Sequence, residues 1–159
     1  MDAQELFKQR IAEVTHRVGL SPLNADLEKW LNQQFGYSSD WFEEVKQLCL
    51  LGIEQGWLCN RTGGGIRYGR IFKPSDELSG FSVDVVEMVD IAGPYHVHPL
   101  GEIDLIMPLD ESALFDDHTA GWMVAPAGSA HAPTVSQGKA LVLYLLPEGQ
   151  IQFTEKSVA

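Results

Sequence analysis

The stretch GPYHVHPLGE, residues 93–102, decides the fold class of this chain. In an extended segment His96 and His98 point to the same side, because side chains on a strand alternate with a period of two. Both rings can then reach one ion. Glu102 follows a Pro-Leu-Gly turn, so the chain can bend and bring its carboxylate back to the same centre.

A second stretch, PAGSAH at residues 126–131, supplies a third imidazole, that of His131. We expect this side chain to arrive from a neighbouring strand. Three imidazoles and one carboxylate are a ligand set that holds a single divalent transition metal in proteins. Two histidines on one strand would be a weak signal, but the glutamate at turn spacing and the third histidine make coincidence much less probable.

The two stretches resemble the two motifs of the cupin superfamily, which read His-x-His, three or four residues, Glu, and then Pro-x-Gly, two residues, His. The resemblance implies a small jelly-roll β-barrel in which one metal is held by His96, His98, Glu102 and His131. The ion would be a divalent transition metal, either iron, manganese, nickel, cobalt or zinc, since this ligand set suits all of them. The alternative is a cupin that keeps the shape and has lost the ion.

Length and composition limit the possible partners of the chain. Its 159 residues suffice for one domain with an added segment. A formal net charge of −11 with only 11 Lys and Arg argues against nucleic acid. No apolar run approaches the roughly 18 residues of a membrane span. The polar, acidic start of the sequence predicts a cytoplasmic location, and we expect Cys49 and Cys59 to be reduced packing thiols.

The chain divides near residue 60 into a helical segment, 1–60, and a barrel domain, 61–159. A first helix is predicted from an apolar stripe that ends at Gly19 and comprises Phe7, Ile11, Val14 and Val18. Ser21 and Pro22 read as the N-cap and first residue of a second helix.

A third helix is predicted to begin near Asp40 with a capping box to Glu43, and to end at Gly52 or Gly56. Three tryptophans in or just after these helices are predicted to pack in the core or between helices and sheet, namely Trp30, Trp41 and Trp57. The three glycines at 63–65 lack the features of a phosphate loop, and we interpret them as a flexible hinge.

After the glycines the pattern changes to short β segments separated by Gly and Pro turns. Seven strands are predicted, at 66–72, 81–90, 95–98, 103–107, 121–124, 140–146 and 150–154. The predicted fold class is therefore mainly β with a helical N-terminal segment, and the resemblance selects a small cupin jelly-roll barrel.

Glu102 and Asp104 are the candidate catalytic residues. Asp104 lies two residues beyond Glu102, so on a regular strand both carboxylates face the barrel interior, where an unused one would be costly. A general acid or base and a partner of a nearby arginine are equally good readings of Asp104. His16 and His118 are expected to be solvated, although His118 could cover the mouth of a pocket.

Basic residues cluster just ahead of the metal motif, at Arg61, Arg67, Arg70 and Lys73. Arg67 and Arg70 fall on opposite faces of a predicted strand, so at most one faces inward, where its guanidinium could clamp a substrate carboxylate. With Tyr95 they are the candidate substrate-binding residues.

The whole chain resembles a narrower group, the small cupins of nitroaromatic breakdown that act as 4-hydroxylaminobenzoate lyases. The resemblance rests on the helical lead-in and on residues 60–70, 93–104 and 121–126 ahead of His131. It implies conversion of a small aromatic carboxylate, 4-hydroxylaminobenzoate, to 3,4-dihydroxybenzoate with release of ammonia. We also expect the chain to form a homo-oligomer.

Two other functions remain open at this point. An iron(II) dioxygenase acting on an aromatic acid would use the same four ligands with open positions for oxygen and substrate. A sensor without enzymatic activity would bind an aromatic acid and signal through its helical segment, although no partner motif is visible.

Overall fold

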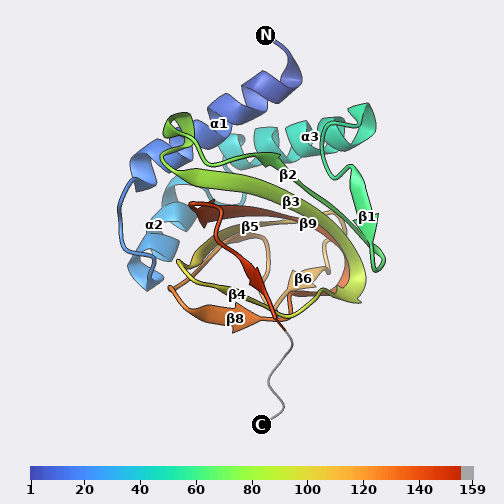
Figure 1. Ribbon diagram of the computed structural model, residues 1–159. Coiled ribbons are helices and arrows are strands. Elements are labelled where there is room, and N and C mark those ends of the chain that lie inside the picture. The colour runs from blue at the N-terminus through green and yellow to red at the C-terminus, as the bar shows by residue number, and fades with distance from the viewer. Residues whose placement is uncertain (155–159) are drawn as a thin grey trace.

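The computed structural model describes residues 1–154, and within them three helices precede two antiparallel sheets (Figure 1). The helices are α1 (Ala3–Val18), α2 (Ala25–Phe35) and α3 (Asp40–Gln55). The mainly β class with a helical N-terminal segment is confirmed. The last five positions of the predicted barrel domain, 155–159, lie outside the described residues.

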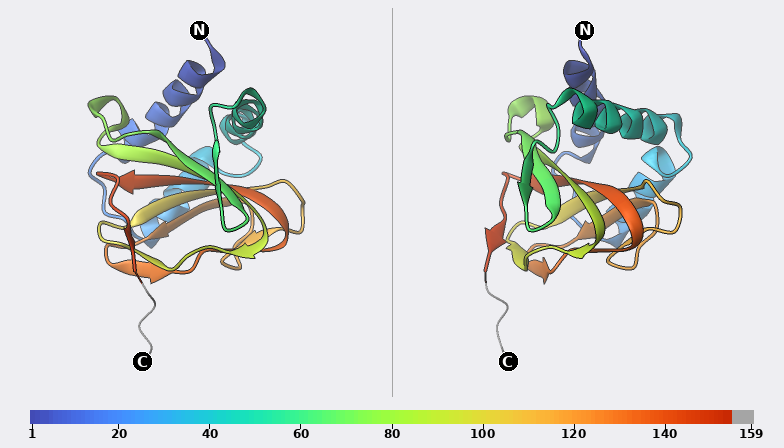
Figure 2. Two further views of the ribbon diagram at one scale, coloured as in Figure 1. Left: turned by 45° about the vertical axis from the view of Figure 1, so that its right-hand side comes forward. Right: turned by 90° about the vertical axis from the view of Figure 1, so that its right-hand side faces the viewer.

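The larger sheet has seven strands in the order β1-β2-β3-β9-β5-β7, with β6 paired to β9. Its strands are β1 (Arg61–Gly63), β2 (Ile66–Phe72), β3 (Phe81–Ala92), β5 (Glu102–Pro108), β6 (Leu114–Phe115), β7 (Gly121–Ala125) and β9 (Thr134–Pro147). The smaller sheet has the order β10-β4-β8, from β4 (His96–His98), β8 (Ser129–His131) and β10 (Gln152–Phe153). A short 3-10 turn, η1 (Asp76–Leu78), precedes β3. The two sheets face each other, as a jelly roll requires (Figure 2).

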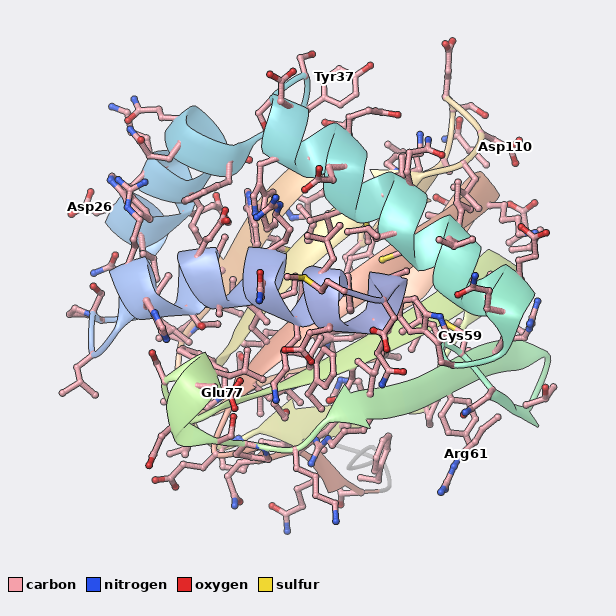
Figure 3. The ribbon with its side chains drawn as sticks, turned by 90° about the horizontal axis from the view of Figure 1, so that it is seen from above. Asp26, Tyr37, Cys59, Arg61, Glu77 and Asp110 are labelled. Atoms are coloured by element: carbon pink, nitrogen blue, oxygen red, sulfur yellow. The ribbon has the colours of Figure 1, made fainter. Side chains whose placement is uncertain are left out.

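The central strands alternate, so each side of the larger sheet buries its own set of side chains. One set packs under the helices and includes Val83, Val85, Ile103, Leu105, Leu143 and Leu145. The other set faces the smaller sheet and includes Met88, Ile106, Val142, Tyr144 and Leu146. Figure 3 shows the helices laid across the outer side of the sheet. The inner side is thereby free to form a site.

The predicted tryptophan packing is confirmed. Trp30, Trp41 and Trp57 all pack against the core between helices and sheet. Trp41 stacks on Trp122 of β7 with ring centres 5.6 Å apart, and its indole nitrogen donates to the Arg10 carbonyl at 3.0 Å. These contacts hold α3 and α1 to the sheet.

The start of α2 was predicted three residues too early. Asn24, not Ser21, is the N-cap, since its side-chain oxygen accepts a hydrogen bond from the Leu27 backbone N–H at 3.0 Å. The cap of α3 is likewise Ser39, one residue before the predicted capping box. The helix is capped at its C-terminal end by Gly56, which adopts the left-handed conformation with φ of 87°.

The hinge interpretation of the glycine run was wrong. Gly63 pairs with Ile66 across the β1–β2 ladder, so Gly64 and Gly65 form a two-residue hairpin turn. Their φ angles of 58° and 82° are both positive, as the tight turn of a twisted hairpin requires. The run therefore fixes the register of an edge hairpin.

Three short strands, β1, β6 and β8, were not predicted, and β9 begins six residues earlier than expected. The last helix ends at Gln55 and the first strand begins at Arg61. The division into segments 1–60 and 61–159 stays a prediction, because helix and sheet residues share one hydrophobic core. No helix in the described part of the chain is long and apolar enough to cross a membrane.

Candidate metal centre and its cavity

The four predicted metal ligands lie together between the two sheets. His96 and His131 are directly opposite in the β4–β8 ladder, and His98 follows on the same face of β4. Glu102 is the first residue of β5 and brings its carboxylate from the larger sheet. One ligand atom from each residue lies within 4.8 Å of the other three. The four residues therefore fit a divalent metal site that bridges the sheets.

The imidazoles turn their Nε2 atoms toward this centre. The buried Nε2 atom of His96 makes no hydrogen bond with any described residue, whereas those of His98 and His131 contact the Glu102 carboxylate, the latter at 3.3 Å. His96 instead donates through Nδ1 to the Pro94 carbonyl at 3.0 Å. Buried polar groups are costly unless they are satisfied, so three imidazole nitrogens and a carboxylate that converge on one point, with His96 Nε2 left without a partner, indicate a ligand. A metal ion satisfies all three lone pairs at once.

Asp116 orients the third imidazole from the loop after β6. His131 Nδ1 lies 2.5 Å from Asp116 Oδ2 and donates to it. The other carboxylate oxygen, Oδ1, accepts from the Thr134 backbone N–H at 2.9 Å. A carboxylate held in this way fixes the ring and its tautomer, leaving Nε2 for the metal. Asp116 itself adopts a positive φ of 46°.

The ligands differ strongly in proton affinity in the metal-free protein. Burial would raise the pKa of Glu102, but contacts from His131 and His98 lower it to about 2. Burial would lower the pKa of His131, but Asp116 and Glu102 raise it to about 9. Burial and the neighbouring imidazoles lower the pKa of His96 to about 4. At neutral pH, Glu102 is therefore ionised, His96 is neutral and His131 carries a proton.

Asp104 is fully buried on the same face of β5 as Glu102, and it has no arginine partner among the described residues. Both of its carboxylate oxygens lack a hydrogen bond to the described residues. Burial, followed by the charge of Glu102, raises the pKa of Asp104 well above its ordinary value. Asp104 therefore holds its proton to a higher pH than an ordinary aspartate, and it lies where it could give up that proton beside the metal ligands.

A cavity of about 1100 Å³ opens beside the metal ligands, with His96 in its wall. Most of its lining is apolar or aromatic, from Ile66, Tyr68, Val86, Met88, Pro133, Tyr144, Leu146, Ile151 and Phe153. The ring of Phe153 lies edge-on to His96 with centroids 5.4 Å apart. This shape and lining suit a flat aromatic ligand whose reacting end lies near the metal ligands.

The structure brings one of the two predicted arginines to this cavity. Arg70 lines it and binds both carboxylate oxygens of Asp84, at 2.8 Å and 3.1 Å. Arg67 points to the other face of β2, where its guanidinium lies 3.7 Å from Glu87. Tyr95 is half-buried and does not line the cavity.

The two remaining histidines lie apart from the metal ligands. His16 is bound to the Glu77 carbonyl at 2.7 Å on the surface, and His118 is exposed and does not line the cavity. His118 therefore does not cover the cavity mouth.

Sequence reasoning missed three residues of the site, Asp84, Asp116 and Tyr144. Asp84, Tyr144 and Asp104 are directly opposite one another on β3, β9 and β5, so one row of polar side chains crosses the inner sheet. The alternation of side chains along β3 and β9 could have placed Asp84 and Tyr144 on the inward face of the sheet, but only with the strand pairing in hand. Asp116 lies in a polar loop, and its spacing from His131 carries no sequence signal.

Comparisons with known proteins agree with this geometry. The family profile described as 4-hydroxylaminobenzoate lyase (PnbB) matches residues 9–153. A 4-hydroxylaminobenzoate lyase from Nocardioides sp. (strain LMS-CY) is 36% identical over 137 residues, covering 80% of this chain and 81% of the relative. Another from Pseudomonas putida is 32% identical over 147 residues, covering 82% and 84%.

The similar solved structures are more distant. An RmlC-like cupin protein from Ralstonia eutropha has a TM-score of 0.43 at 13% identity, covering 61% of this chain and 66% of that one. The DMSP lyase DddQ from Ruegeria pomeroyi has a TM-score of 0.47 at 18% identity, covering 84% and 79%. The sequence relatives carry the assignment, because the matched region includes all four metal ligands and every residue that lines the cavity. The chain belongs to the 4-hydroxylaminobenzoate lyase family.

Proposed function

We propose that the protein is a metal-dependent lyase that converts 4-hydroxylaminobenzoate to 3,4-dihydroxybenzoate and ammonia. The observation that carries the proposal is the converging set of three histidines and a glutamate beside an aromatic-lined cavity, in a chain of this family. The substrate would lie along the cavity with its hydroxylamino group toward His96 and its ring among the apolar side chains.

The overall reaction is balanced without an outside oxidant. The N–O bond, the C–N bond and one ring C–H bond of the substrate break, and two C–O bonds form from two waters. The hydroxylamino oxygen leaves as water and the nitrogen as ammonia, so one water is consumed overall. The ring is oxidised as the N–O bond is reduced, so neither molecular oxygen nor a redox cofactor is needed. The site has to supply proton transfer and stabilisation of charge.

A divalent metal held by His96, His98, Glu102 and His131 would supply Lewis acidity to the hydroxylamino oxygen when bound. Iron, manganese, nickel, cobalt and zinc all suit these donors. Elemental analysis of the purified protein should identify the ion and give about one per chain.

Asp104 and Glu102 would perform the proton transfers. Asp104 keeps its proton to a higher pH than an ordinary aspartate, because burial and the charge of Glu102 raise its pKa. Its proton would assist departure of the hydroxylamino oxygen, and its carboxylate would then accept a proton from the attacking water. Tyr144, directly opposite on β9, lines the cavity and would connect Asp104 to the bound substrate.

Arg70 is a candidate substrate-binding residue because it lines the cavity, and it would act by neutralising Asp84. An unpaired Asp84 carboxylate in the cavity wall would repel an anionic substrate. Arg67 and Tyr95 do not line the cavity, so we assign them no contact with substrate.

The test is anaerobic incubation of the metal-loaded protein with 4-hydroxylaminobenzoate. Ammonia and 3,4-dihydroxybenzoate should form in equal amounts, and in H₂¹⁸O both new ring oxygens should carry the label. Product with only one labelled ring oxygen would mean that the hydroxylamine oxygen migrates, which keeps the lyase but refutes attack by water at the carbon beside the nitrogen. Turnover that requires oxygen would indicate a dioxygenase, and binding without turnover would indicate a sensor.

We further propose that the enzyme works in the cytoplasm as a homo-oligomer. The buried free thiols of Cys49 and Cys59 support a reducing compartment. Light scattering of the purified protein would measure the oligomeric state.

A further inference from the structure

The carboxylate of an aromatic acid needs a cation in the cavity, and Arg61 and Arg70 are the arginines among the described lining residues. Arg70 is already engaged, because its Nε and Nη2 bind the two oxygens of Asp84. Nη2 also donates to the Gly149 carbonyl at 3.0 Å. Its bidentate edge therefore has no room for a second carboxylate.

Arg61 faces the cavity because of its position in the β1–β2 hairpin. It is directly opposite Tyr68, and residues opposite each other in an antiparallel ladder project to the same side. Tyr68 lines the cavity, whereas the next pair, Thr62 and Arg67, projects to the other side. The tight glycine turn fixes this register, so Arg61 cannot exchange faces without breaking the hairpin.

The guanidinium of Arg61 makes no ion pair and no side-chain hydrogen bond with any other residue in the described range 1–154. It is solvent-exposed at the edge of the molecule, beyond the helices that cover the sheet (Figure 3). By contrast, the guanidinium of Arg67, on the same hairpin, is paired with Glu87.

The hairpin is packed against the segment that leads into the metal motif. A side chain at Gly65 would meet Ile91 Cδ1 at 2.9 Å, and one at Gly93 would meet Ile66 Cδ1 at 3.5 Å. Gly93 and Pro94 continue the cavity wall to His96. One wall thus runs from the hairpin to the metal ligands, with apolar side chains between its two polar ends.

We propose that Arg61 binds the substrate carboxylate at the cavity mouth and so determines the preference for carboxylated aromatic rings. This assignment rests on the proposed function for the identity of the substrate. The polar ends of the ligand would meet the metal ligands and Arg61, and the ring would lie between Tyr68, Val86, Pro133 and Phe153.

The test compares binding of 3,4-dihydroxybenzoate and catechol to the metal-loaded protein by calorimetry. The two probes share the hydroxyl groups that face a metal, and only the first has a carboxylate. The wild type should prefer 3,4-dihydroxybenzoate by between about 10-fold and 100-fold, as expected for a charge-assisted pair. Arg61→Leu should reduce this preference to about twofold or less, while Arg61→Lys should retain part of it.

Arg67→Leu is the matched control, because it removes the same charge from the opposite face of the same hairpin. It should keep the wild-type preference. The proposal is overturned if Arg61→Leu keeps that preference, if Arg67→Leu loses it equally, or if the wild type shows none. These outcomes are separate from failure of the lyase assignment, which would be seen as absence of ammonia release by the wild type.

Discussion

The metal-free protein should bind a divalent metal more tightly as the pH rises from 7 to 9, because His131 carries a proton that the metal must displace. Burial opposes this proton, but Asp116 and Glu102 raise the pKa of His131 to about 9. The pKa is raised, so the protonated ring prevails below about pH 9 and the metal-binding neutral ring above it. Glu102, with a pKa of about 2, and His96, with a pKa of about 4, release no proton in this range.

The magnitude follows from the titration of one site. With a pKa of about 9, His131 is ~1% neutral at pH 7 and about half neutral at pH 9. The apparent affinity should therefore increase about 50-fold over this range, and binding at pH 7 should release about one proton. Calorimetry with Mn²⁺ in two buffers of different ionisation enthalpy measures the release, and chelator competition measures the affinity.

Asp116→Asn separates the two roles of this carboxylate. Loss of its charge should lower the pKa of His131, so that fewer protons are released at pH 7 and the affinity levels off at a lower pH. Loss of the oriented ring should weaken binding at pH 9 by about 10-fold to 100-fold. Asp104→Asn is the control for a proton released by Asp104. An unchanged affinity between pH 7 and pH 9, or no proton release by the wild type, would refute the reasoning.

Three further outcomes follow from the site. His96→Ala should lose the metal and the activity together, whereas His118→Ala should keep both; elemental analysis showing metal-free but fully active protein would contradict the metal site. Asp104→Asn should lower kcat by about 10²-fold to 10⁴-fold with little change in KM or Tm, since it replaces the carboxylic acid by an amide of the same shape that cannot transfer a proton. Unaltered turnover would remove Asp104 from the mechanism. Arg70→Leu should raise KM and lower Tm, because it leaves Asp84 unpaired in the cavity, and adding Asp84→Asn should restore part of both; identical kinetics in the single and double variants would argue against charge neutralisation.

The metal ligands could be predicted from the sequence because their chemistry depends on local spacing. His96 and His98 share a strand face, and a short turn leads to Glu102. The helices were predicted for the same reason, since their apolar stripes repeat within a few residues. Their caps shifted by one to three residues because Ser21, Asn24, Ser39 and Asp40 are all acceptable N-caps, and tertiary packing decides between them.

The rest of the site depends on pairings between distant strands. The row of Asp84, Tyr144 and Asp104 exists because β9 lies between β3 and β5, an order that no local pattern records. Asp116 reaches His131 across 15 positions of chain by a loop with positive φ angles. The glycine run was misread because flexibility and a tight turn favour the same residue, and only the ladder around it distinguishes them.

The division of the ligands between a large and a small sheet has a consequence for metal selection. Glu102 belongs to a seven-stranded sheet backed by helices, whereas the histidines lie on two strands of three residues each. Because the sheet that carries the histidines is small, we expect its distance from β5 to adjust to ions of different radius. The affinity of the site for metal ions should then follow the general order Mn²⁺ < Fe²⁺ < Co²⁺ < Ni²⁺ < Cu²⁺ > Zn²⁺. The metal ions available in the cell should decide which ion occupies the site. The ion recovered from an expression host would report that host's metal pool, and the native ion has to be found by exchange and turnover.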